Sequence, residues 1–318
     1  MRGKIKTVDK MYKHYTVMKK ELVESLNCRN QDKIYVDGTL GGGGHSEEIL
    51  KHLDGKGILF SFDVDIDAIN YSKKRLEGYK NIKIINDSYT NIIENLEKEG
   101  IKQIDGGIIF DFGASYHHLT SESRGFSFKY DCKLDMRFNQ NSVLTACEIV
   151  NKYKEDELVY IFSHYGEEHY SKRIARAIVE TRKNKKIETT FMLNEIIKKT
   201  IPTTNSRIHY ATRVYQALRI EVNNELKNIK QILYKIVPFL KVGGIISVLS
   251  FHSLEDKIVK EVFKEMSKQC RCEINEPKCI CGGPLLKLVN KKPLLPSKEE
   301  IKINPPSRSV KMRTAVRI

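Results

Sequence analysis

A short β-branched run passes directly into four consecutive glycines in Ile34-Tyr35-Val36-Asp37-Gly38-Thr39-Leu40-Gly41-Gly42-Gly43-Gly44-His45-Ser46. The run predicts a strand over 34–36, and Ser46 predicts the cap of a helix that continues to Leu53. Glycine lacks a Cβ atom and tolerates positive φ, so this turn lets the backbone approach a ligand closely. Residues 34–46 therefore predict a ligand-binding turn after the first strand of a sheet.

Outward from this turn, short β-branched runs alternate with amphipathic stretches, which is typical of a parallel sheet wound with helices. Further strands are predicted over 57–62, 82–85 and 106–110, and polar or glycine residues follow each of them. Ligands bind at the carboxyl edge of the strands in open α/β sheets. The sequence therefore predicts an α/β fold with its site at that edge.

The strand rhythm stops after His118 for roughly 90 residues, and helices are predicted over 143–162 and 170–181. We therefore expect a helical insertion over 119–210 within a discontinuous α/β domain formed by 1–118 and 211–318. The second part of that domain predicts a helix over 211–240 and a strand over 245–251. A helix opened by Ser253-Leu254-Glu255-Asp256 and a final antiparallel strand over 310–318 follow.

The chain has 55 basic and 40 acidic residues and a formal charge of +15, which favours a polyanionic partner such as nucleic acid. The alternative is a lysine-rich protein whose helices are solvated by lysine. No apolar run reaches about 18 residues, so no membrane span or membrane partner is expected. Seven cysteines without a signal peptide indicate reduced thiols and a cytoplasmic protein.

Asp63 closes the second predicted strand about twenty residues after the glycines, where an acid can accept both ribose hydroxyls of an adenine nucleoside. Nicotinamide dinucleotides and S-adenosylmethionine share this requirement. Asp37, before the glycines, would repel a pyrophosphate but could assist the ammonium group of S-adenosylmethionine, so the methyl donor is favoured. The alternatives are a flexible hairpin for the glycines and a helix cap for Asp63.

The chain contains several longer motifs: Asp37-Gly38-Thr39, Gly43-Gly44-His45-Ser46, Arg124-Gly125-Phe126-Ser127-Phe128, Leu134-Asp135-Met136-Arg137, Ala211-Thr212-Arg213, Gln216-Ala217-Leu218-Arg219-Ile220, Ser250-Phe251-His252-Ser253-Leu254-Glu255-Asp256, Ser307-Arg308-Ser309 and Met312-Arg313. In these motifs the chain resembles the RsmH (MraW) family of 16S ribosomal RNA cytosine-N4 methyltransferases. The resemblance runs from His14-Tyr15-Thr16-Val17 to the C-terminus, so it covers nearly the whole chain.

The resemblance implies a class I, Rossmann-like S-adenosylmethionine-dependent methyltransferase domain with an inserted helical domain that recognises RNA. The implied substrate is 16S rRNA in the small ribosomal subunit, at a decoding-centre P-site cytosine, and a homodimer is left open. Transferred position by position, the cofactor contacts fall on Gly43, Gly44, His45, Asp63, Tyr89, Asp111 and His118. At Tyr89 an aromatic ring would pack against adenine, with ordinary strand-end packing as the alternative.

The chain departs from the family in the segment expected to line the methyl-transfer site. Relatives usually read Asp-Leu-Gly-Val-Ser-Ser-Pro-Gln there, and this chain has Asp111-Phe112-Gly113-Ala114-Ser115-Tyr116-His117-His118. Tyr210 also replaces a common proline, and Gly42 stands where a basic residue is frequent. A paralogue with a shifted target base is therefore an open alternative.

Methyl transfer from a sulfonium needs alignment of the acceptor and the methyl group, and an acceptor aimed at the amine N–H. Asp111, or a backbone carbonyl beside it, is the expected acceptor, and Asp111 is assigned as catalytic. Tyr116 or Phe112 could stack on the extruded base, and Tyr116 is assigned this role with a buried structural tyrosine as the alternative.

The expected substrate contacts are Arg213, Asp135 and Arg137, although an ion pair between the last two that braces the insertion is the favoured interpretation. His209, Arg219 and the basic run 182–186 could touch phosphates, and a solvated surface explains Arg219 and the run equally well.

Four cysteines, Cys270, Cys272, Cys279 and Cys281, form a C-x-C-x6-C-x-C pattern that could hold zinc. Reduced structural cysteines explain the pattern adequately, and no metal site is assigned. Two other functions remain open at this point. They are methylation of a different RNA site or a protein, and an RNA-binding ribosome assembly factor without catalysis. A nicotinamide oxidoreductase is disfavoured because G-x-G-x-x-G is missing.

Overall fold

The computed structural model describes residues 16–318 except residue 30, residues 203–208, residues 273–279 and residue 281. The chain divides into two compact units: unit 1, formed by 1–113 and 226–318, and unit 2, formed by 114–225. The sequence predicted these boundaries after residues 118 and 210. The second boundary moves because α10 (Thr212–Asn223) packs on α6 (Ala146–Lys152) and α7 (Glu155–His164), which belong to unit 2.

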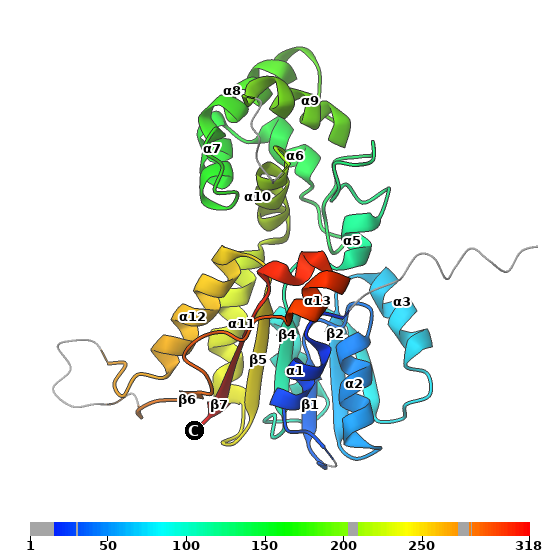
Figure 1. Cartoon of the computed structure of the whole chain (residues 1–318), viewed down its shortest axis with the longest axis vertical. Helices are drawn as coiled ribbons and strands as arrows, with labels where there is room; N and C mark the ends of the chain where they lie inside the picture. Colours follow the sequence, from blue (N-terminus) through cyan, green and yellow to red (C-terminus); the bar gives the residue numbers. More distant parts are fainter. Residues whose placement is uncertain (1–15, 30, 203–208, 273–279, 281) are drawn as a thin grey trace, which may run out of the picture. The chain divides into compact units, whose positions relative to one another are not determined.

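A seven-stranded sheet forms the centre of unit 1, in the order β3-β2-β1-β4-β5-β7-β6 (Figure 1). The first five of these strands pair in parallel, and β7 runs antiparallel to β5 and β6. The strand bounds are β1 (Ile34–Asp37), β2 (Ile58–Asp63), β3 (Ile82–Asn86), β4 (Gly107–Asp111), β5 (Ile245–Ser250), β6 (Leu286–Leu288) and β7 (Lys311–Arg317). The predicted α/β sheet and its antiparallel closing strand are confirmed. The sequence did not predict β6, because three residues are too few for alternation to show.

Side chains alternate along each strand, so the sheet contributes to two apolar layers. Leu59 and Ile109 pack with helices α1 (Lys19–Ser25), α2 (Gly44–Leu53) and α3 (Ile66–Arg75). Phe60 and Phe110 pack with α4 (Ile92–Lys98), α11 (Glu225–Phe239) and α12 (Ser253–Met266). The remaining elements of unit 1 are η1 (Tyr89–Asn91), α13 (Lys298–Ile303) and η2 (Pro305–Ser309). Because helices cover both faces of the sheet, a ligand site is expected at the carboxyl ends of its strands.

Two predicted helix starts shift. α2 begins at Gly44 with Gly43 as its cap, three residues earlier than the predicted cap Ser46. The buried Ser46 hydroxyl donates instead to Asp37 Oδ2 at 2.7 Å and caps nothing. α12 is capped by His252, whose backbone N–H donates to Glu255 Oε2 at 3.2 Å, so Ser253 is the first helical residue.

The single helix predicted over 211–240 is wrong. α10 ends where Asn224 adopts a left-handed conformation with φ 51°, and α11 begins at the next residue. Asparagine visits this conformation more readily than most residues, and apolar spacing alone does not mark such a break.

Unit 2 is helical, and its apolar core is separate from the two layers of unit 1. Besides α6, α7 and α10, its helices are α5 (Tyr116–Thr120), α8 (Ser171–Asn184) and α9 (Thr190–Thr200). The predicted segment 143–162 corresponds to α6 and most of α7, which are separated by Tyr153 and Lys154. In the part of the chain that the structure describes, no helix is both long and apolar enough to cross a membrane.

Candidate active site

The glycine turn links the end of β1 to the start of α2 and requires glycine at two kinds of position. Gly41 and Gly43 have φ values of +49° and +73°, which few other residues adopt without strain. A Cβ atom on Gly44 would lie 1.8 Å from Thr16 Oγ1, so only glycine fits between α2 and the segment before α1. The turn therefore depends on glycine for its backbone conformation and for its packing against Thr16, and its close approach to a ligand stays a prediction.

Asp37 is fully buried and holds this turn from within. Its Oδ1 accepts the Thr39 backbone N–H at 3.0 Å, and its Oδ2 accepts the Ser46 hydroxyl. Burial raises the pKa of Asp37 to about 6. Since both oxygens bind the turn, the structure gives Asp37 a bracing role, and its contact with the cofactor's ammonium group stays a prediction.

Asp63, the last residue of β2, is partly exposed at the carboxyl edge of the sheet. Its Oδ2 accepts the Gly41 N–H at 2.8 Å, and its Oδ1 accepts the Asp65 N–H at 2.9 Å. Burial raises the pKa of Asp63 to about 6. The helix cap of α3 is Asp65, whose side chain accepts from Asp67, so the alternative interpretation of Asp63 as that cap is wrong.

Asp111 closes β4 at the same edge, and its backbone N–H donates to Thr39 Oγ1 in the glycine turn at 2.6 Å. Its side chain is 15% exposed, and Oδ2 lies 3.6 Å from His45 Nδ1. Burial, Asp37 and Glu255 raise the pKa of Asp111 well above its usual range. Among the described residues, no group hydrogen-bonds to the buried Oδ1 atom, which is therefore available to a ligand.

Tyr89 begins η1, after the end of β3, and lies on an aromatic cluster. Its ring centroid is 5.5 Å from that of Phe112 and 6.0 Å from that of Phe110. This is the strand-end packing that the sequence left as the alternative, and contact with adenine stays a prediction.

The other predicted site residues lie in unit 2. Tyr116 is the first residue of α5, and its stacking on a base stays a prediction. His118 is buried, with its ring centroid 5.0 Å from Phe126 and 4.9 Å from Phe138. That aromatic packing is a structural role, and a cofactor contact of His118 stays a prediction.

Asp135 and Arg137 form a bidentate ion pair, with Arg137 Nε 2.8 Å from Oδ1 and Nη2 2.6 Å from Oδ2. Arg137 Nη1 also donates to the carbonyl oxygens of Gln140 and Ser142. The favoured bracing role is therefore present. Arg213 lies in the first turn of α10, and contacts of these three residues with RNA remain predictions.

The basic candidates have defined surroundings within unit 2. Arg219 Nε donates to the buried Glu225 at 2.8 Å, so Arg219 is not on a solvated face. The His209 ring stacks on Phe128 with a centroid distance of 4.1 Å, and burial lowers the pKa of His209. Of the run 182–186, the first three residues complete α8 instead of forming a loop.

The four-cysteine pattern falls partly outside the described residues. Cys279 and Cys281 lie outside the described residues, and neither Cys270 nor Cys272 forms a disulfide with another described cysteine. The Ile280 backbone N–H lies 3.2 Å from Cys272 Sγ. Nothing in these contacts assigns a metal.

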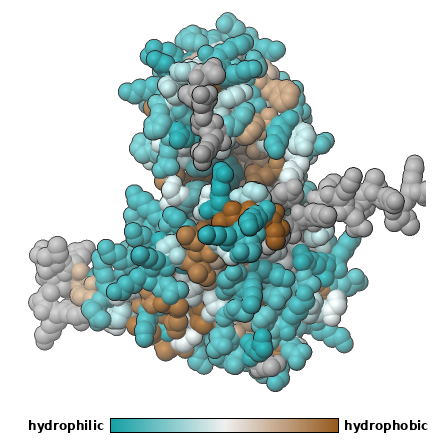
Figure 2. Space-filling model, in the orientation of Figure 1, coloured by the Kyte–Doolittle hydropathy of each residue, from teal (hydrophilic) through white to brown (hydrophobic). Residues whose placement is uncertain are grey.

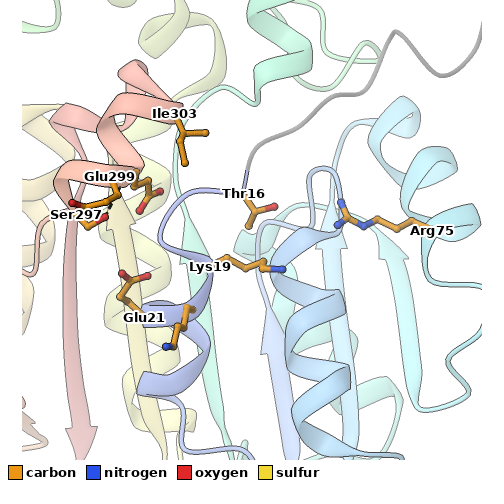
Figure 3. Close-up of a pocket in the computed structure, with 9 residues that line it drawn as sticks. Thr16, Lys19, Glu21, Arg75, Ser297, Glu299 and Ile303 are labelled. Atoms are coloured by element: carbon orange, nitrogen blue, oxygen red, sulfur yellow. Dashed lines mark hydrogen bonds between the residues drawn. The ribbon is translucent and has the colours of Figure 1, made fainter.

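One pocket of unit 1 lies beside the glycine turn, with a volume of about 470 Å³ (Figure 3). Its lining carries charges of both signs and comprises Thr16, Lys19, Lys20, Glu21, Arg75, Ser297, Glu299, Glu300 and Ile303. Arg75 donates to the Gly42 carbonyl oxygen, and Lys19 pairs with Glu48. None of the residues predicted to bind the cofactor lines this pocket. Of its lining residues, Arg75 contacts the outside of the glycine turn through the Gly42 carbonyl oxygen.

Sequence reasoning missed Thr39 and Glu255 as parts of the site. Thr39 connects the glycine turn to β4, and Glu255 is fully buried while accepting the Phe251 N–H at 2.7 Å. An acid among the apolar positions of a predicted helix could have indicated a buried functional residue. Only the fold shows that the charge of Glu255 raises the pKa of Asp111.

A glycine turn after β1, acids at the ends of β2 and β4 and an antiparallel β7 beside β5 define a class I S-adenosylmethionine-dependent methyltransferase. The glycine turn beside Asp63, whose oxygens keep lone pairs beyond those used by Gly41 and Asp65, fits such a cofactor.

The model of the MraW methylase family matches residues 11–318, and the chain belongs to this family. It is 47% identical over 309 residues to ribosomal RNA small subunit methyltransferase H of Caldicellulosiruptor bescii, covering 97% of this chain and 100% of that protein. The protein of the same name from Clostridioides difficile is 45% identical over 312 residues, covering 96% and 99% of the two chains.

Proposed function

We propose that this protein methylates 16S rRNA of the small ribosomal subunit, in the cytoplasm, at the N4 amine of a cytosine, with S-adenosylmethionine as donor. One observation carries the proposal. The glycine turn, Asp63 and Asp111, which the resemblance assigns to the cofactor, meet at one sheet edge of unit 1, in a chain that matches two rRNA methyltransferases over almost their whole length. The P-site cytosine is the target that the family resemblance supports.

S-adenosylmethionine supplies, when bound, a methyl group on a positively charged sulfur. Asp63 would accept hydrogen bonds from the ribose hydroxyls, because each of its oxygens has a lone pair beyond those used by Gly41 and Asp65. Asp111 Oδ1 would accept an N–H of the cytosine amine. That contact restores lone-pair character to the nitrogen as it attacks, so it strengthens in the transition state.

Unit 2 is the part that we propose to bind RNA, and α8 is its most basic helix. Lys172, Arg173 and Arg176 are exposed on α8, while Ile174 and Ile178 face the core. Tyr116, Arg213, Asp135 and Arg137 are the proposed base and phosphate contacts. A homodimer stays a further prediction. Unit 1 exposes several large apolar side chains, Val289, Leu294, Leu295 and Ile303, and Figure 2 shows apolar areas on the face of unit 1 turned to the viewer.

RNA affinity is expected to fall steeply with salt, because lysine and arginine displace counterions from phosphates. Replacing both Lys172 and Arg173 by alanine should weaken binding and reduce the slope of log affinity against log salt by about 2. Filter binding of small subunits between low and high salt measures this slope. An unchanged slope in the folded double variant would remove α8 from the RNA surface, and a flat wild-type plot would argue against phosphate contacts altogether.

Cofactor affinity should depend on pH because the pKa of Asp63 is about 6. Protonation removes an acceptor for the ribose, so affinity is full above about pH 6 and falls up to about tenfold per unit below it. The contribution of Asp63 to folding stability depends on pH in the opposite direction. The raised pKa means that the folded protein binds more protons than the unfolded chain, so this contribution to stability falls as pH rises towards 6. Calorimetric titrations from pH 5 to pH 8, with thermal unfolding of the same samples, test both directions.

Incubation of small subunits with methyl-labelled S-adenosylmethionine, followed by nucleoside analysis, tests the reaction itself. N4-methylcytidine is the expected product. Label on another nucleoside or on ribosomal protein would favour the alternatives left open by the change at Tyr116-His117-His118. Binding of the subunit without transfer would favour an assembly factor.

A further inference from the structure

His45 and Asp111 face each other within unit 1 and are both largely buried. His45 is the second residue of α2 and Asp111 the last residue of β4. Nδ1 of His45 lies 3.6 Å from Oδ2 of Asp111, which is an ion-pair distance, and the side chains are 5% and 15% exposed. The other carboxylate oxygen, Oδ1, is the one that no described group hydrogen-bonds.

The partner of the opposite ring nitrogen determines the proton arrangement. His45 Nε2 lies 2.9 Å from the Val17 carbonyl oxygen, which can only accept a hydrogen bond, so Nε2 carries a hydrogen. In a neutral ring Nδ1 would then turn a lone pair towards the Asp111 carboxylate, which is repulsive. A protonated Nδ1 makes the same 3.6 Å contact an attractive ion pair, so the proton belongs on Nδ1.

The charges around Asp111 favour retention of that proton. Asp37 on β1 and Glu255 on α12 are the other acids that face Asp111, and both are buried. Their charges and burial disfavour an uncompensated third carboxylate, so the imidazole is the compensating group. With the proton on the imidazole, Asp111 keeps its negative charge and Oδ1 remains a charged acceptor.

We propose that His45 is a positioning residue for Asp111, holding a proton on Nδ1 opposite Oδ2 so that Asp111 stays a carboxylate and Oδ1 stays aimed as an acceptor. The role for Oδ1 rests on the proposed function, because the N–H that it accepts belongs to the methylated amine. The shared proton itself does not depend on the identity of the substrate.

The proton arrangement can be measured in the full-length protein without cofactor or RNA. Ring nitrogen shifts of ¹⁵N-labelled histidine, with His45 assigned by comparison with His45→Asn, should stay constant between about pH 5.5 and 8. A His45 titration midpoint near the ordinary value of about 6.5, leaving Nδ1 bare, would overturn the proposal. This readout remains decisive even if no methyl transfer to the small subunit is found.

Two substitutions separate the contact with Asp111 from the contact with Val17. Asparagine keeps a donor near the position of Nδ1, and glutamine keeps one near the position of Nε2. His45→Gln should lower the methyl-transfer rate at neutral pH about tenfold for each unit by which the pKa of Asp111 then exceeds the assay pH. The rate should recover as pH rises, because Asp111 then ionises without its partner.

His45→Asn should retain a higher rate than His45→Gln, with a pH profile closer to that of the wild type. The reverse order would show that His45 only anchors the Val17 carbonyl and would overturn the proposal. His52→Gln is the matched control, since His52 lies on the same helix and its Nδ1 contacts the Glu48 carbonyl at 2.9 Å. Its rate and pH profile should equal those of the wild type. Absence of transfer by the wild type would contradict the proposed function and not the shared proton.

Discussion

Replacing Asp111 by asparagine is expected to lower the rate of methyl transfer about a hundredfold or more, the usual cost of one lost transition-state contact. The variant keeps the size of the side chain but loses the charge that draws on an N–H as positive character develops on the nitrogen. Cofactor affinity should change far less, because the proposed contact strengthens only as the methyl group moves. Single-turnover methylation of small subunits, normalised to the folded fraction of the variant, measures the effect.

The alternative role for Asp111 is structural. Its backbone N–H already binds Thr39 Oγ1, and the carboxylate could serve only to order the turn that follows β4. In that case Asp111→Asn would reduce stability while the rate per folded molecule stayed near normal. Asp87→Asn is a suitable control, since Asp87 accepts from Asn91 and Asn95 after β3 and is assigned no part in the chemistry.

Replacing Asp63 by alanine should weaken S-adenosylmethionine binding by about 1–3 kcal/mol, as expected for lost hydrogen bonds to a charged group. Because Asp63 also accepts the Gly41 N–H, the alanine variant loosens the glycine turn as well. Asp63→Asn keeps an acceptor and should fall between the wild type and the alanine variant. Isothermal calorimetry gives the three affinities.

Asp65→Ala is the matched control for Asp63. Asp65 caps α3 two residues later, and loss of such a cap costs about 1 kcal/mol of stability. We expect this variant to be less stable with a nearly unchanged cofactor affinity. An unchanged affinity in folded Asp63→Ala would contradict the assignment of Asp63 to the ribose.

The polar carboxyl edge of the sheet was predictable because it depends on local patterns. Each strand is a short β-branched run, and the polar groups at its carboxyl end follow within a residue or two, as at Asp63 and Asp111. The run of glycines also predicts a turn whose backbone needs positive φ values. The break at Asn224 and the edge strand β6 were not predictable, because a single left-handed residue and three paired residues leave no periodic signal.

Interactions between distant residues were also beyond sequence reasoning. His45 was assigned to the cofactor by resemblance, whereas its contacts with Val17 and Asp111 exist only after α2 and β4 pack together. Arg219 illustrates the same limit, since a buried partner six residues away replaced the solvated face that its charge suggested. The local sequence pattern determines which side chains reach the carboxyl edge of the sheet. Tertiary packing determines the partners, and so the protonation, of those side chains.

The central claim is that this protein modifies one cytosine of 16S rRNA. Mapping modified nucleotides of that rRNA by mass spectrometry, in cells with and without the protein, tests it most directly. We predict that one N4-methylated cytosine at the P site loses this methyl group when the protein is absent and regains it on complementation with the wild type but not with Asp111→Asn. An identical modification pattern in the two strains, or loss of a methyl group at a different base, would contradict the account.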